Sequence, residues 1–554
     1  MLWAKLIRSS AQIETDRWRR LLTWVLGSAL LTVLFYFFGL HFLWDNADTD
    51  RGLLQGLDMA RGNVLLNHWY SGSDSYWTID SVFFAIGVLL IGAIVILLHV
   101  VSALVWAGVV VSGVYVATLG LRRWSTVAGA ATVVVILGFP CVLLASFLAP
   151  SALHVATALF ALIGFIGLRN GRFGWGWIVA VVVFAAGTLG DPLIVAYGLV
   201  PAFLVGVLDS VRNRRWTKGL ATCSAPWVAL VVAWITRVIA VHLGTYQITG
   251  TTPIAPRWLV LPNLRLLFEN SISLFGLGTS LSTSGVPWEL ELFRSVVLVA
   301  VASGIAVGAA CLLLGVLNGR PRIELRGMVG RSEASFRLSD LLILASLGDA
   351  VTYVSLSVDA TGVRYLTAGV IFESILAAML MGQLANSLRS RRAKRMVTIV
   401  GLVVAGICAS SVGVAMSQPA PTSPSAQLGR FLAARHLYRG VGDYWSSAST
   451  TVFSNEVVKV RQVVESPFGG LVPYRWISKS DWYSGTFQFL VYNAAIPAGQ
   501  SIRQAVQFPF APVARTYVDH QFHIVVWKKP EPMRGLNAVP NPSAPPLRRA
   551  HAGL

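Results

Sequence analysis

The chain has 554 residues, of which 55% are hydrophobic and only 12% are charged. A soluble protein of this length has too little interior to bury so much apolar surface, whereas repeated runs of about 20 apolar residues match a bilayer core of roughly 30 Å. Much of the net charge of +19 falls in short basic loops between the apolar runs. The charge therefore predicts membrane topology and argues against a nucleic-acid-binding protein.

The first apolar run predicts a retained membrane helix at 21–43. It is long for the hydrophobic region of a signal peptide, and no convincing cleavage site follows it. Residues 1–20 are then expected in the cytoplasm, and the loop at 44–81 is expected outside it.

The next apolar stretch, 82–120, is long enough for two spans. However, Arg122 and Arg123 favour the cytoplasm, which requires an odd number of crossings. We therefore predict an interfacial or re-entrant helix at 82–97, followed by one span at 99–119.

Nine further apolar runs predict spans at 127–147, 153–168, 177–189, 193–208, 220–243, 295–317, 341–357, 366–384 and 397–416. The total of about eleven spans places the C-terminus outside the cytoplasm. The fold class expected for 21–417 is thus an all-α polytopic membrane domain, with a second large extracytoplasmic loop at 244–293.

The composition changes to Pro, Ser and Thr from Gln418 onward, and a polar region of roughly a hundred residues follows. Alternating β-branched residues predict strands at 451–464 and 520–528, so we expect a small extracytoplasmic α/β or β domain at 418–530. The Pro- and Ala-rich end, 531–554, is predicted to be disordered.

Three carboxylates, Asp45, Asp48 and Asp50, follow the first predicted span within six residues. Carboxylates at a membrane surface can accept a proton from a nucleophile or hold a divalent cation. We expect a functional role for Asp45 and Asp48, and we expect Asp50 to cap a short interfacial helix at 53–59.

Other candidates lie on the same predicted face. Asp191, in a hairpin before a proline, is either a turn residue or part of a site. Arg364 suits a phosphate, or it pairs with Asp359. The aromatic residues of the first loop either form an interface belt or stack on a sugar. We expect substrate binding to draw on His68, Trp69, Asp80, Asp191, Arg364 and Tyr365.

Three ionisable residues, Arg237, His242 and Asp349, fall inside predicted spans, where charge is costly and usually functional. We expect His242 to be an interfacial histidine. Arg237 and Asp349 either form a structural pair or line the pathway of a proton-coupled transporter.

Nucleotide chemistry has no support in the sequence, which contains neither a P-loop nor a dinucleotide-binding glycine fingerprint. The four cysteines all lie in apolar runs, and no Cys/His cluster has metal-ligand spacing. An activated group must therefore arrive from the membrane or from a partner.

The chain resembles the GT-C glycosyltransferases in its acidic motif after the first span, its large first loop, its many spans and its C-terminal domain. The chain is similar to a group of actinobacterial membrane proteins with that architecture at Asp45-Asn46-Ala47, Gly62 to Trp69, Asp74, Trp77 to Asp80, Gly442 to Trp445 and Trp476 to Trp482.

This resemblance implies a bacterial plasma-membrane enzyme that transfers a sugar, with inversion, from a polyprenyl-phosphate donor. The acceptor would be a cell-envelope glycan, lipid or protein on the extracytoplasmic side of the bilayer. Asp45 or Asp48 would be the general base, and Arg364 would hold the lipid phosphate. The family commonly has two adjacent acids, whereas two residues separate Asp45 from Asp48 here. A cation, Mg²⁺ or Mn²⁺, is compatible with this class. The alternatives are a transporter or flippase of a lipid-linked sugar and a non-enzymatic envelope scaffold.

Overall fold

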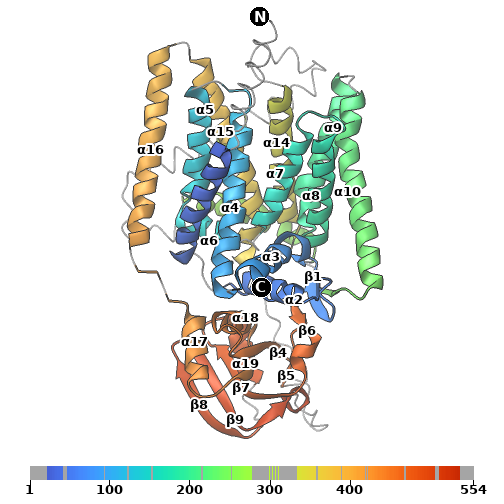
Figure 1. Ribbon diagram of the computed structural model, residues 1–554, viewed down its shortest axis with the longest axis vertical. Helices are drawn as coiled ribbons and strands as arrows, with labels where there is room; N and C mark the ends of the chain where they lie inside the picture. The colour runs from blue at the N-terminus through green and yellow to red at the C-terminus, as the bar shows by residue number, and fades with distance from the viewer. Residues whose placement is uncertain are drawn as a thin grey trace, which may run out of the picture.

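The computed structural model describes residues 22–41, 46–276 and 333–536. It also describes the single positions 299, 302, 303, 306 and 310. Within the three ranges, the residues left out are 93, 122–123, 151–153, 214–215, 251–252, 357–359, 389, 418, 421, 467–469 and 506–510. The protein is mostly helical, with a helical bundle above a C-terminal region that contains the larger β-sheet (Figure 1).

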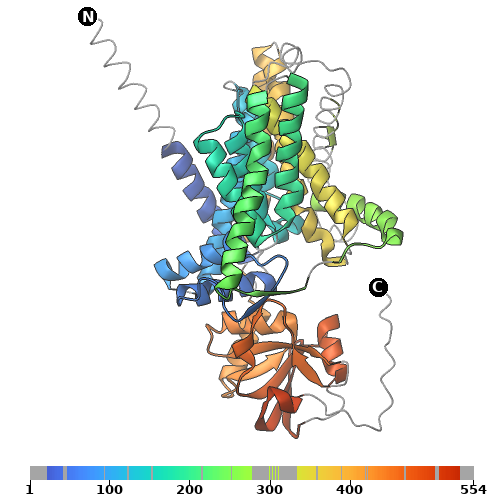
Figure 2. The same cartoon turned by 90° about the vertical axis from the view of Figure 1, so that its right-hand side faces the viewer.

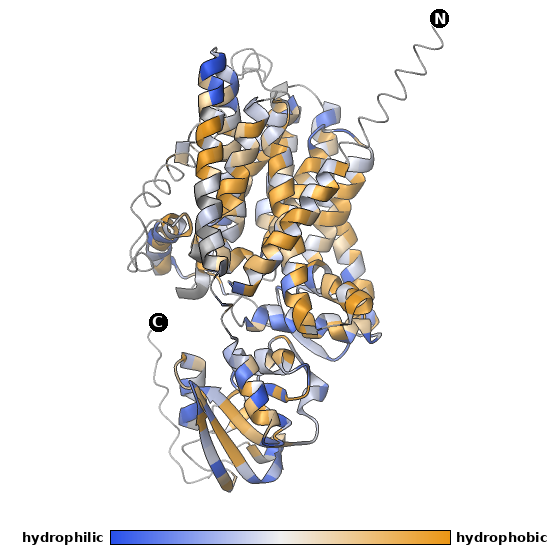
Figure 3. Ribbon diagram, turned by 60° about the vertical axis from the view of Figure 1, so that its left-hand side comes forward, coloured by the Kyte–Doolittle hydropathy of each residue, from blue (hydrophilic) through white to orange (hydrophobic). Residues whose placement is uncertain are grey.

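Five of the described helices are long and apolar enough to cross a membrane: Leu22–His41, Val95–Thr118, Trp216–His242, Glu333–Ser355 and Gly362–Ser387. Apolar residues run along the helices of the bundle, and hydrophilic residues gather toward its ends (Figure 3). This distribution matches a hydrocarbon solvent around the middle of the bundle.

The bundle helices after Leu22–His41 are α4 (Ile94–Thr118), α5 (Trp124–Val133), η2 (Val134–Gly138), α6 (Val142–Leu148), α7 (Val155–Leu168), α8 (Trp175–Gly190), η3 (Val195–Leu199), α9 (Val200–Asn213), α10 (Trp216–His242), α14 (Glu333–Ser355), η5 (Ala360–Leu366), α15 (Thr367–Ser387) and α16 (Arg391–Ser417). The predicted span at 295–317 lies almost wholly outside the described residues.

The predicted continuous span at 127–147 is wrong. The helix formed by α5 and η2 ends at Gly138, and α6 is a separate short helix. Pro140 explains the break, because it has no amide hydrogen to donate and disfavours helical backbone at the residue before it.

The stretch 82–120 forms one short helix and one long helix, as expected. The short helix α3 (Val82–Ile91) ends at Gly92, whose φ of 74° is favourable only for glycine. Leu89 and Leu90 are exposed on α3. The amphipathic helix α11 (Val260–Leu274), which follows η4 (Arg257–Leu259), also exposes apolar residues. Both α3 and α11 extend sideways from the bundle (Figure 2), as interfacial helices do.

The first loop forms α2 (Ala47–Ala60), which is longer than the predicted helix at 53–59. Its cap is Asn46, whose side chain accepts hydrogen bonds from the amides of Asp48 and Thr49. The expected capping role of Asp50 is therefore wrong. Asp50 lies one turn inside α2 and accepts a hydrogen bond from the Ser449 hydroxyl.

The C-terminal region is an α/β domain built on a six-stranded mixed sheet in the order β5-β4-β3-β7-β9-β8. Strands β4, β3 and β7 are parallel, and the outer pairs are antiparallel. Its elements are α17 (Pro424–Ala433), β3 (Arg439–Gly442), α18 (Tyr444–Phe453), β4 (Lys459–Glu465), β5 (Leu471–Pro473), β6 (Ser478–Lys479), η6 (Ser480–Tyr483), β7 (Thr486–Asn493), α19 (Pro497–Ala505), β8 (Val513–Asp519), β9 (Phe522–Pro532) and η7 (Met533–Leu536).

One predicted strand of this domain is correct and one is partly wrong. The strand predicted at 520–528 is β9, but the strand predicted at 451–464 begins only at Lys459. Residues 451–453 end α18, where the Thr451 hydroxyl bonds back to the Ser447 carbonyl. The predicted disorder from 531 also begins too early, since β9 and η7 continue to Leu536, and the rest of the tail lies outside the described residues.

A second, three-stranded sheet joins the domain to the bundle. Its strands are β1 (Trp69–Gly72) from the first loop, β2 (Gln247–Gly250) from the second loop, and β6 from the C-terminal domain, in the order β2-β1-β6. Three distant segments therefore meet where the bundle and the domain touch.

Candidate functional site

Helix α2 presents Asp48 to both parts of the molecule. Asp48 is buried, and its Oδ2 lies 3.0 Å from Nη1 of Arg364 on η5. Its Oδ1 accepts a hydrogen bond from the Tyr444 hydroxyl at the start of α18. Burial raises the pKa of Tyr444 well above its ordinary range, so this hydroxyl stays protonated and donates to the carboxylate.

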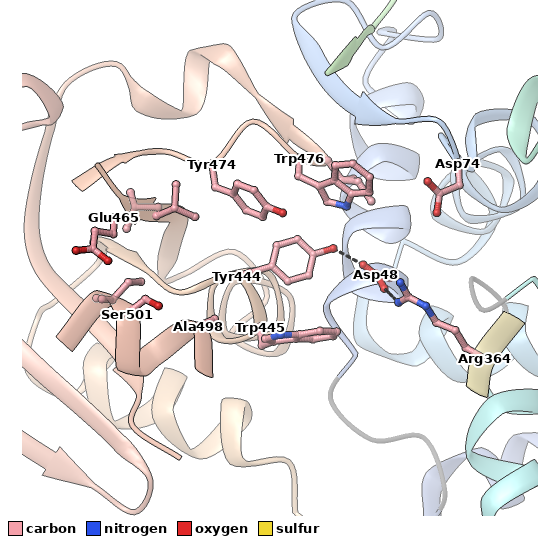
Figure 4. Close-up of a pocket in the computed structure, with 14 residues that line it drawn as sticks. Asp48, Asp74, Arg364, Tyr444, Trp445, Glu465, Tyr474, Trp476, Ala498 and Ser501 are labelled. Carbon is pink, nitrogen blue, oxygen red and sulfur yellow. Dashed lines mark hydrogen bonds and ion pairs between the residues drawn. The ribbon is translucent and has the colours of Figure 1, made fainter. Parts of the chain in front are cut away.

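Asp48 lines a cavity of about 530 Å³ between the bundle and the C-terminal domain. Asp48, Asp74 and Arg364 face it from the bundle, and aromatic side chains face them from the domain (Figure 4). The aromatic residues are Tyr444, Trp445, Tyr474 and Trp476. An apolar aromatic wall opposite a few charged groups is typical of a small-molecule site, and here it would suit a sugar that carries an anionic group.

Asp74 is a second carboxylate in this cavity. The Tyr76 hydroxyl donates to its Oδ2 at 3.1 Å. Burial raises the pKa of Asp74, and the neighbouring carboxylates Asp191 and Asp48 add to this, against a lowering contribution from His154. A raised pKa makes Asp74 a better proton acceptor than an ordinary aspartate.

A buried ion pair lies behind the cavity. His154 Nδ1 is 2.7 Å from Oδ2 of Asp191, which also accepts a hydrogen bond from the Thr157 hydroxyl at 2.6 Å. The His154 ring stacks on Tyr365, with 5.1 Å between the ring centroids. Tyr365 is next to Arg364 in the chain, so the pair supports the element that carries the cavity arginine.

The predicted site residues are thus only partly brought together. Asp48 and Arg364 are in direct contact, and Tyr365 and Asp191 join them through His154. Asp45 and Asp359 lie outside the described residues.

Three other predicted binding residues do not line this cavity. Asp80 is buried on η1 (Trp77–Ser81). His68 and Trp69 line a different cavity of about 490 Å³, so the structure does not bring them together with Asp48, and their role in substrate binding stays a prediction. Trp69 donates its indole N–H to Asp58 at 2.8 Å, which fixes its ring.

Sequence reasoning singles out Tyr444 and Trp445 only as part of a segment of family resemblance, and it does not predict that they form the aromatic wall. Asp443 accepts from the amide of Ser446 as the N-cap of α18 and so places Tyr444 and Trp445 at the cavity. The capping residue is a signal that marks the start of this helix in the sequence. By contrast, nothing local to Tyr474 and Trp476 indicates that they approach the bundle.

The expected pair of Arg237 and Asp349 is wrong. Arg237 donates to the Tyr246 carbonyl at 3.2 Å and lies over the Tyr246 ring. Asp349 accepts from the amide of Gly369 at 3.1 Å, between α14 and α15. Each residue thus has its own partner in the bundle.

Among the described residues, no group of three or more His, Cys, Asp or Glu side chains is arranged to hold a metal ion. Mg²⁺ or Mn²⁺ binding stays a prediction. Comparison of the chain with protein-family models and with curated proteins gives no match in either case.

Proposed function

We propose that this protein is a GT-C-type glycosyltransferase of a bacterial plasma membrane, with about eleven spans and an extracytoplasmic C-terminal domain. It would transfer a sugar from a polyprenyl-phosphate donor to a cell-envelope glycan, lipid or protein. The observation that carries the proposal is the cavity in which Asp48, Asp74 and Arg364 face an aromatic wall. The charged groups suit the reacting bond and the phosphate, and the wall suits the sugar.

The reaction needs one proton acceptor and one site for the leaving phosphate. The acceptor hydroxyl attacks the anomeric carbon, its proton passes to a carboxylate, and the bond between the sugar and the phosphate oxygen breaks. The products are the glycosylated acceptor and the polyprenyl phosphate, whose charge Arg364 would neutralise. Asp48 is the proposed base.

The contact between Asp48 and Arg364 implies an exchange of partners. In an inverting transfer the base and the leaving phosphate lie on opposite sides of the anomeric carbon, so the two side chains cannot act while they are 3.0 Å apart. We expect the donor phosphate to take the place of Asp48 on Arg364. The carboxylate is then free to accept the proton of the acceptor.

The substitution Asp48→Asn tests the proposal. The amide has the same shape but a far lower basicity, so transfer should fall by about 10²–10⁴. The measurement is transfer of labelled sugar from a panel of polyprenyl-phosphate sugars to endogenous acceptors in membranes that contain the full chain.

Two further variants control this test. Asp48→Glu retains a carboxylate displaced by one methylene and should recover part of the activity. Asp481→Asn removes a carboxylate that is 60% exposed outside the cavity and should transfer normally. Full transfer by a folded Asp48→Asn protein would sink the catalytic assignment.

A further inference from the structure

The second cavity lies where α10 ends and the three-stranded sheet begins. Its lining includes His68, Trp69, Arg237, Val241, Tyr246 and Gln247. The first loop, α10 and the second loop all contribute to it, and Ser480 adds an edge from the C-terminal domain. Because β1 pairs with β2 and β6, the walls are held in place by backbone hydrogen bonds.

Arg237 is the only Lys or Arg that lines this cavity, and no carboxylate lines it among the described residues. One guanidinium nitrogen, Nη2, donates to the Tyr246 carbonyl, and the guanidinium carbon lies 4.3 Å from the centre of the Tyr246 ring. The other, Nη1, is buried and makes no hydrogen bond within the described part of the chain. No described carboxylate forms an ion pair with Arg237. A partly buried charge that has no counter-ion among the described residues is costly, so the site is suited to an anion.

The cavity reaches the lipid-facing side of α10. Val241 lines it and is 53% exposed, and Val238 and Trp234, one and two turns earlier, are also exposed. Exposed apolar residues on a helix long enough to cross the membrane indicate contact with acyl chains. His68 and Gln247, which also line the cavity, are polar and exposed. The cavity is therefore lined by apolar groups together with polar and cationic ones.

We propose that this cavity binds the phosphate head group of a membrane lipid, with Arg237 as the principal ligand. The planar guanidinium of Arg237 lines the cavity and matches phosphate oxygens, and the acyl or prenyl chain would leave along the exposed face of α10 beside Val241. His68 and Gln247 are placed to donate further hydrogen bonds. The inference does not depend on the proposed glycosyl transfer, because it concerns binding at a site separate from Asp48.

The test measures binding to the purified full chain in a neutral detergent by microscale thermophoresis. The ligands are farnesyl phosphate, dioctanoyl phosphatidylglycerol, farnesol and inorganic phosphate. We expect at least one of the two phosphate lipids to bind at least ten times more tightly than farnesol.

Preference for farnesyl phosphate identifies a prenyl-phosphate site, and preference for phosphatidylglycerol identifies a phospholipid site. Either result supports the inference. Farnesol binding as tightly as both lipids, or inorganic phosphate binding as tightly as the better lipid, overturns it.

Variants locate the binding. Arg237→Gln should weaken the better lipid at least tenfold, and Arg237→Lys should weaken it less, because the charge is kept but the planar fork is lost. Arg265→Gln is the matched control, since Arg265 is an exposed cation on α11 that already pairs with Glu269. Melting curves without lipid establish that each variant is folded. Equal losses in Arg237→Gln and Arg265→Gln would show nonspecific attraction and overturn the assignment, as would unchanged affinity in both Arg237 variants.

Discussion

The pair formed by His154 and Asp191 makes the stability of this end of the bundle depend on pH. Burial alone would lower the pKa of His154, but the charge of Asp191 and their hydrogen bond raise it above its ordinary value of 6.5. Burial would raise the pKa of Asp191, but His154, Thr157 and the amide of Leu193 lower it below 3.8. The contribution of Asp191 is therefore lost as the pH falls through its folded pKa. The contribution of His154 is complete below pH 6.5 and is lost as the pH rises through its folded pKa.

We expect the melting temperature of the full chain in detergent to be highest between about pH 4 and pH 6.5 and to fall at higher pH. In Asp191→Asn the neutral amide no longer favours the charged form of His154, so the fall above pH 6.5 should disappear. Breaking a buried ion pair costs about 3–5 kcal/mol, so the variant should also melt lower at pH 6. A wild-type midpoint that does not change between pH 6 and pH 9 would contradict this prediction.

At the scale of elements, Arg51 joins α2 to the C-terminal domain. It is buried, its Nε donates to Oε1 of Gln462 at 2.7 Å, and its Nη2 donates to the Tyr444 carbonyl. The guanidinium also lies over the Tyr444 ring, 3.5 Å from its centre. Arg51 thus fixes the position of the α18 residue that touches Asp48.

The variant Arg51→Leu should loosen this junction. It leaves two acceptors without their donor at a cost of about 1–3 kcal/mol each, so amide hydrogen exchange in α18 should become faster. Arg61→Leu is the control, because Arg61 ends the same helix but is exposed, and its ion pair with Glu456 should contribute at most about 1 kcal/mol. Equal exchange rates in α18 of the two variants would argue against a special role for Arg51.

The sequence predicts the part of the site that topology alone determines. Asp48 and Arg364 are 316 residues apart, yet the charge pattern of the loops places both at the same end of the bundle, and they touch. The division of 82–120 into the short helix α3 and the long helix α4 is predicted from hydrophobicity and loop charge as well. These predictions succeed because hydrophobicity and loop charge indicate where helices begin and end and which ends lie together.

The rest depends on tertiary contacts that leave no local pattern. Tyr474 and Trp476 reach the cavity only because β6 pairs with β1. The β-branched Thr451 and Val452 predict the start of a strand, but both lie in α18, where the Thr451 hydroxyl finds acceptors in the preceding turn and in β4. His68 and Trp69 follow the acidic cluster in sequence, but their loop turns toward α10 and a second cavity.

At the scale of the whole molecule, the cavity exists only while the C-terminal domain is docked. Its charged wall comes from the bundle, and its aromatic wall comes from the domain (Figure 4). Trp476 is central to the docking, because its indole lies against two glycines, Gly72 at the end of β1 and Gly250 at the end of β2. The junction needs small residues at these positions so that the ring can approach the backbone.

The variant Gly250→Ala tests this docking without removing a polar group. An added Cβ would lie 2.7 Å from Cζ3 of Trp476, so the indole must move. Such overpacking typically costs about 1–3 kcal/mol, and we expect a lower melting temperature, faster exchange of the β1 and β6 amides and weaker glycosyl transfer. Gly27→Ala is the control, because a Cβ there meets no atom within 4 Å.

Adding Trp476→Phe to Gly250→Ala removes the part of the ring that clashes, so the β1 and β6 amides of the double variant should exchange more slowly than those of Gly250→Ala alone. If the effects of the two substitutions on amide exchange simply add, the domain is held by its other contacts. The indole then does not determine how the aromatic wall meets Asp48 and Arg364.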